Sequence, residues 1–151
     1  MLIRRLARPF LAAVFVSSGV DVLRNPGPRV TRAEPVTSKL TEILPLPEDT
    51  EELVKLNAAA QLVAGVMLAA GKLPRLSAGV LAASLVPTTA AGHRFWEEDE
   101  PRAKAAQRIH FLKNVAILGG LLLAVVDTEG APSLGWRARR AAERAKKRIS
   151  D

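Results

Sequence analysis

The feature that most constrains this chain is a set of four apolar stretches without a single charged residue. They cover residues 9–20, 56–71, 76–92 and 115–126. Extended by about one turn into their polar flanks, they become residues 6–23, 52–71, 76–93 and 108–127. Each extended stretch then holds enough residues for roughly 27 to 30 Å of helix, close to the hydrocarbon thickness of a bilayer. None of them alternates as a strand would, and their Ala and Leu content favours helix.

The predicted fold is therefore all-α: a four-helix transmembrane bundle over residues 1–127. Of the 151 residues, 48% are hydrophobic but only 4% are aromatic, whereas soluble domains of this size draw on more aromatic side chains for their cores. A soluble bundle with four buried core helices is the alternative. It is disfavoured because helices that are apolar all round need amphipathic partners to cover them, and this chain has few.

Charge asymmetry predicts the orientation of the four spans. The N-terminal "MLIRRLAR", the link "GKLPR" and the tail from Arg137 are rich in Lys and Arg, and the first two contain no acid. The loops over residues 24–50 and 94–107 mix their bases with many acids. By the positive-inside rule we expect a multi-pass protein of the cell membrane with both termini in the cytoplasm. A cleaved signal peptide is the rival interpretation; it leaves three spans and puts "GKLPR" on the wrong side.

In this topology the polar residues of all four spans gather at the outer end. The candidates for a ligand pocket there are Asp21, Asn57, Gln61, His93, Arg94, His110, Lys113 and Asn114. On the fourth span Gln107, His110 and Asn114 share one helix face. Asp21 is expected to face inward and pair with a cation, because a charge in lipid costs about 2.5 to 3.5 kcal/mol. The candidate partners are Arg24, Arg94, Arg108 and Lys113.

Two interpretations of this polar layer stay open at the level of sequence. The first is structural: interhelical hydrogen bonds, side chains that extend to the headgroup boundary, and an interfacial ion pair between Lys55 and Glu51. The second is an outward-facing pocket for a polar or amphipathic ligand. No metal site is predicted, because His93 and His110 lack the spacing of a ligand set. The sequence has no phosphate loop, nucleophile elbow or paired-acid motif, and no cysteine for thiol or disulfide chemistry.

The two remaining segments carry predictions of their own. In the first loop Val36, Leu40, Ile43 and Leu44 fall on one face, which predicts a short interfacial helix able to cover the outer end. The tail over residues 128–151 is Ala-rich and basic, and is predicted to be helical. Beside a membrane it is expected to contact anionic lipids, with each base worth about 1 kcal/mol near their headgroups. Binding of nucleic acid is not predicted, and docking of an acidic partner is the alternative.

Three segments of the chain resemble the DoxX family of membrane proteins, most closely its actinobacterial members. They are "RPFLAAVFVSSGVDVLRNPGPRV", "AGVMLAAGKLPRLSAGVLAASLVPTTAAGHRFWEE" and "RIHFLKNVAILGGLLLAVVDTEGAPSLGWRARRA". The resemblance implies a four-helix membrane protein linked to quinone-dependent oxidoreductase or oxidative-stress complexes. It brings no set of catalytic residues, and no motif in the sequence encodes a cofactor. The cofactor that the resemblance implies is a quinone. Whether the chain is itself an enzyme stays open: the alternative is a non-catalytic scaffold that recruits soluble redox enzymes.

Overall fold

The structure, a computed structural model, describes residues 2–128 together with Trp136, Arg139, Arg140 and Glu143. In that part of the chain all regular secondary structure is helical, so the all-α prediction is confirmed. The elements are α1 (Leu2–Arg24), α2 (Gly27–Ile43), α3 (Thr50–Ala69), α4 (Pro74–Gly92), the 3-10 turn η1 (Phe95–Glu97) and α5 (Pro101–Val126). A helix lies over each of the four predicted spans. The predicted basic tail lies outside the described residues, apart from Thr128 and the four single residues.

Local sequence explains where the helices begin. Asp49 caps α3 by accepting a hydrogen bond from the backbone N–H of Glu51 at 2.8 Å, and the first turn carries two acids that favour the helix dipole. α5 extends beyond the predicted fourth span at its N-terminal side. α5 begins at Pro101, seven residues before residue 108, because proline suits the first helical position and Glu100 caps the turn.

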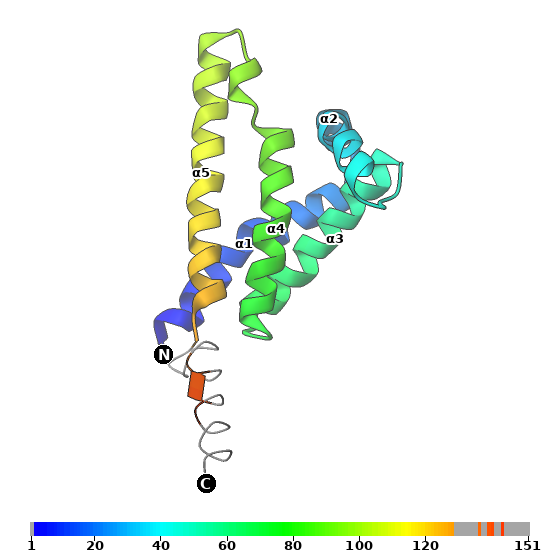
Figure 1. Cartoon of the computed structure of the whole chain (residues 1–151). Coiled ribbons are helices and arrows are strands. Elements are labelled where there is room, and N and C mark those ends of the chain that lie inside the picture. The colour runs from blue at the N-terminus through cyan, green and yellow to red at the C-terminus, as the bar shows by residue number, and fades with distance from the viewer. Residues whose placement is uncertain (1, 129–135, 137–138, 141–142, 144–151) are drawn as a thin grey trace.

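The helices form an open array in which each packs mainly on its neighbours (Figure 1). α1 packs along α3, α3 against α4, and α4 runs beside the long α5, while α2 lies across one end of α3 and α4. The buried core between them consists of Ala12, Phe15, Ala64, Leu68, Ala78, Leu81, Ala82, Leu85 and Leu121. Many of these side chains are small. They allow close approach of helix backbones, as is usual for helices that associate within a membrane.

Three helices in the described part of the chain are long and apolar enough to cross a membrane: α1, α3 and α5. α4 has 19 residues, but Arg75, two serines, two threonines and two prolines lower its mean hydropathy. It is therefore not among the helices that are apolar enough to cross a membrane. Its role as a fourth span stays a prediction. In the apolar 18-residue stretch of α5, only 6% is buried inside the structure. This leaves a broad apolar surface for lipid.

The basic segments meet at one end of the molecule. Arg4 of α1 forms an ion pair with Asp127 after α5, with 2.8 Å between Nε and Oδ2. Arg75, at the start of α4, donates from Nε to the carbonyl oxygen of Val125 at 2.7 Å. The first turns of α1, the α3–α4 turn and the end of α5 are therefore neighbours. Which side of a membrane this end faces stays a prediction.

The helix expected after the first span is longer than predicted, and its packed face differs. α2 has 17 residues, and Pro35 lies within it. Val36 and Leu40 do face the bundle, but Ile43 is 78% exposed and Leu44 is exposed as well. Leu44 does not lie on the predicted face because α2 ends at Ile43 and Leu44 has an extended conformation.

Candidate functional site

Two amides of α3 bind one threonine of α4. Asn57 Nδ2 and Gln61 Nε2 each donate to Thr88 Oγ1 at 3.2 Å. The Thr88 hydroxyl in turn donates to the carbonyl oxygen of Ser84 at 2.8 Å. Because Asn57 and Gln61 are four residues apart, they lie about one helical turn apart on the face of α3 that meets α4.

The polar face predicted on the fourth span meets the other side of α4. Asn114 Nδ2 donates to Thr89 Oγ1 at 3.0 Å, and Gln107 Oε1 lies 2.8 Å from Nδ1 of His93. The rings of His93 and His110 are stacked, with centroids 5.2 Å apart. An amide oxygen can only accept, so Nδ1 of His93 is the donor in this contact.

A cavity of about 560 Å³ lies beneath α2, between the end of α1, α3 and the end of α4. Its volume is in the range of small-molecule pockets, and most of its walls are aliphatic. The apolar walls include Val22, Ala33, Val36, Leu40, Leu46, Leu53, Val54, Leu56 and Pro87. The polar lining consists of Ser18, Arg29, Arg32, Thr37, Asn57, Gln61, Thr88 and His93. We call this cavity the α2 pocket.

Gln61 is the most deeply placed polar residue of the α2 pocket. The residue is only 5% exposed. Its Oε1 has no hydrogen-bond partner in the described part of the chain, where Nε2 makes the one bond of this side chain. Among the described residues, however, every side-chain oxygen or nitrogen that is fully buried has a hydrogen-bond partner. Oε1 is therefore accessible, and because Gln61 lines the α2 pocket, this oxygen can accept a hydrogen bond from a ligand bound there.

Two arginines of the α2 pocket were missed by the sequence analysis. Arg29 and Arg32 line it from α2, and no carboxylate is among the lining residues. The signal was present, since both precede Val36 and Leu40 at helical spacing and extend the same face. They were overlooked because the proline-rich segment was expected to hold only a short helix.

α2 is held over the pocket by two contacts with different elements. Arg29 forms an ion pair with Asp21 near the end of α1. Thr37, which is buried, shares a hydrogen bond with Thr50 at the start of α3, with 3.0 Å between the two hydroxyl oxygens. These contacts make α2 a cover for the pocket.

Five of the predicted pocket residues lie outside the α2 pocket: Asp21, Arg94, His110, Lys113 and Asn114. The prediction for Asp21 was wrong, because its side chain is 53% exposed and its partner is Arg29, which the fold of α2 brings back onto α1. Arg94 pairs with Glu97 at 3.1 Å, and Lys113 is exposed with no ion pair among the described residues. The predicted ion pair between Lys55 and Glu51 is present at 2.5 Å.

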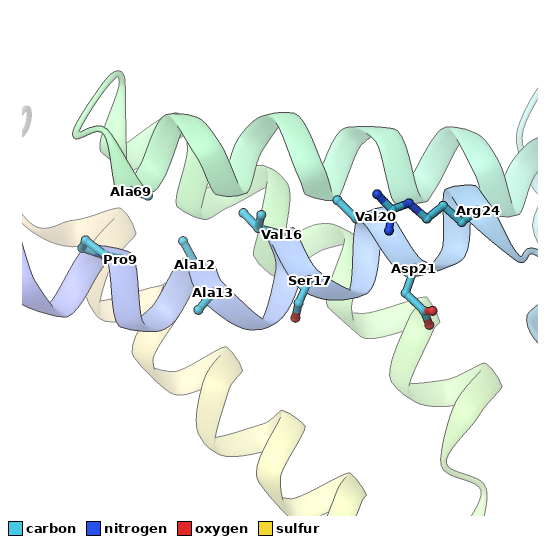
Figure 2. A pocket seen from close by; sticks show the side chains of 9 residues that line it. All are labelled: Pro9, Ala12, Ala13, Val16, Ser17, Val20, Asp21, Arg24 and Ala69. Atoms are coloured by element: carbon cyan, nitrogen blue, oxygen red, sulfur yellow. The ribbon is translucent and has the colours of Figure 1, made fainter.

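Asp21 instead lines a shallow groove along the outer face of α1 (Figure 2). The groove measures about 630 Å³, and its apolar floor is formed by Pro9, Ala12, Ala13, Val16, Val20 and, from α3, Ala69. Ser17, Asp21 and Arg24 are its polar members. We call it the α1 groove. Among the described residues, no three His, Asp or Glu side chains gather closely enough to hold a metal ion in either cavity.

Comparison with known proteins identifies the family. A family model described as DoxX matches residues 3–94, which is more than half of the chain. The matched segment runs from α1 to the end of α4 and includes every residue that lines the α2 pocket. No curated protein and no solved structure matches the chain. The chain belongs to the DoxX family of membrane proteins.

Proposed function

We propose that the chain binds a quinone head group in the α2 pocket and serves as a small subunit of a quinone-linked redox system. In this proposal it is a multi-pass protein of the cell membrane with cytoplasmic termini, and the α2 pocket lies at the outer leaflet. The observation that carries the proposal is the amide of the buried Gln61, which lines a mostly aliphatic cavity and has an accessible oxygen.

The hydrogen-bonding groups of the pocket suit both oxidation states of a quinone. A quinone carbonyl accepts, and Asn57 and Gln61 each retain one amide N–H beyond the one that binds Thr88. A quinol hydroxyl donates, and Oε1 of Gln61 accepts, as does Nε2 of His93 in the tautomer that carries its proton on Nδ1. The aliphatic walls from α2 and α3 then cover the ring, while an isoprenoid chain can leave toward the bilayer.

In this proposal the electrons come from outside this chain. The sequence has no cysteine, so thiol chemistry and cysteine-ligated clusters are excluded. We assign the supply or removal of the electrons to a soluble redox partner at the membrane surface, while this protein positions the quinone. That assigns the chain a binding role within the complex.

The test is mass spectrometry of the lipid extract of the purified protein, with a matched pair of variants. We expect a quinone to copurify with the natural chain, and Gln61→Leu to reduce the bound amount about fivefold to tenfold, since a hydrogen bond contributes about 1 to 1.5 kcal/mol. Asn114→Leu is the control, because it removes an amide that also binds a threonine of α4 but lies outside the pocket. Absence of quinone, or equal losses in both variants, would contradict the proposal.

A non-catalytic scaffold is the second candidate, favoured by one observation at η1. Trp96 is half exposed and makes edge contacts with Phe95 and Phe111 at 5.2 and 6.0 Å between ring centroids, next to the acidic residues 97–100. Such a surface can dock a soluble redox enzyme. On this alternative Trp96→Ala abolishes membrane recruitment of the partner enzyme, whereas Gln61→Leu leaves it unchanged.

A further inference from the structure

The end of the molecule opposite the α2 pocket concentrates positive charge. Three arginines come from the first turns of α1, and Lys72 and Arg75 come from the α3–α4 turn. The end of α5 joins them through the contacts of Arg4 and Arg75. Within the described residues of these three segments, Asp127 is the only carboxylate. The excess of cations therefore arises from segments that are distant in sequence and adjacent in space.

The cations of this end are not equivalent. Arg4 is paired with Asp127, and the guanidinium of Arg75 donates to the carbonyl oxygen of Val125. Arg5 and Lys72 are exposed and form no ion pair in the described part of the chain. The Arg8 guanidinium lies over the turn itself, since a Cβ on Gly71 would be 3.4 Å from its nitrogen. Arg5 and Lys72 thus leave positive charge beside the α3–α4 turn.

The α1 groove begins beside these cations. One end of the groove is formed by Pro9 and Ala69 (Figure 2). Pro9 directly follows Arg8, and Ala69 lies two residues before Gly71 of the turn. From Pro9 to Val20 the floor is apolar apart from Ser17, and it extends for about 16 Å at 1.5 Å per residue. That length is about half of a hydrocarbon core of roughly 30 Å, or one leaflet.

We propose that the α1 groove holds an acyl chain of an anionic phospholipid whose phosphate binds Arg5 and Lys72. Phosphate oxygens form strong charge-assisted hydrogen bonds with such side chains. The head group lies at this end because Arg5 and Lys72 both contribute charge here that is unpaired among the described residues, whereas at the far end Asp21 is neutralised by Arg29 and Arg24 is the one remaining cation among the groove's lining residues. The α1 groove and the α2 pocket have no lining residue in common, so the lipid site does not depend on the proposed quinone site.

The charge part of the site is tested with the full chain in detergent by native mass spectrometry. Phosphatidylglycerol and phosphatidylcholine with the same acyl chains are added in equal amounts, and retention of each is measured. We expect the natural chain to prefer phosphatidylglycerol. The double variant Arg5→Gln/Lys72→Gln is expected to weaken retention of phosphatidylglycerol about 25-fold, roughly fivefold per base, and to leave phosphatidylcholine unchanged.

The matched control is Arg108→Gln/Lys113→Gln, which removes two exposed cations from the other half of the molecule. It changes the net charge equally and should preserve the lipid preference. If the natural chain shows no preference, or if both double variants lose it equally, the cations at the α3–α4 turn do not form a headgroup site.

The groove part of the site is tested by filling it with an apolar side chain that a membrane tolerates. Ala13→Phe should reduce the retention of both phospholipids, whereas Ala116→Phe, at an exposed position of α5 outside the groove, should not. If Ala13→Phe leaves lipid retention intact, the groove holds no acyl chain. If it instead converts a dimer to a monomer in detergent, the groove seats a second copy of this chain, and the lipid proposal is wrong.

Discussion

The contact between α1 and α3 depends on a glycine that has no room for a side chain. A Cβ on Gly19 would lie 2.9 Å from the carbonyl oxygen of Ala58 and 3.0 Å from Cβ of Leu62. Both neighbours belong to the backbone or the stem of α3, so neither can move without moving the helix. Gly19→Ala must therefore separate the helices by a few tenths of an ångström or more, and overpacking of this kind typically costs about 1 to 3 kcal/mol.

Gly119→Ala is the matched comparison. Gly119 lies within α5, and a Cβ there would meet nothing within 4 Å. Both substitutions gain about 0.5 to 1 kcal/mol of helix stability, because alanine loses less backbone entropy than glycine on folding. Since that gain is common to both variants, the difference between them isolates the cost at the α1–α3 contact.

The assay is thermal unfolding of the purified variants in one detergent. For a chain of this size 1 kcal/mol corresponds to about 2 to 4 °C, so Gly19→Ala is expected to melt about 2 to 12 °C below Gly119→Ala. Gly65→Ala should be milder than Gly19→Ala, because its Cβ would meet a methyl group of Val16, which can rotate. A Gly19→Ala protein that melts at or above the temperature of Gly119→Ala would refute the close approach of the two helices.

Three further outcomes are expected. Asp21→Ala should shift the melting temperature as little as Lys55→Ala, because both residues belong to half-exposed ion pairs, and a marked loss for Asp21→Ala alone would contradict this. A reporter that is active only outside the cytoplasm should work when inserted within residues 44–49 and fail when fused after Asp151; the reverse pattern would overturn the proposed topology. Removal of residues 137–151 should leave insertion and orientation unchanged in a protease-protection assay, because the N-terminal segment and "GKLPR" still carry five bases. An inverted or uninserted protein would show that the tail determines topology.

The positions of the helices and the grouping of their polar ends could be predicted because both follow from local properties. Apolar runs of near-span length, Ala and Leu content and the placement of Lys and Arg are present in the order of residues alone. The shared face of Gln107, His110 and Asn114 was likewise predictable, since helical periodicity determines which residues meet a neighbouring helix. The structure confirms that this face lies against α4.

The sequence by itself determined an all-helical chain with apolar spans and a polar end opposite a basic end. A helix able to cover that polar end was also predicted, but only the tertiary structure decided that α2 pairs Arg29 with Asp21 and encloses the pocket above Gln61. The physical reason is that helix propensity and hydropathy act along the chain, whereas the direction of α2 after Pro26 depends on contacts such as Thr37 with Thr50. Those contacts form between segments whose relative placement no local pattern encodes.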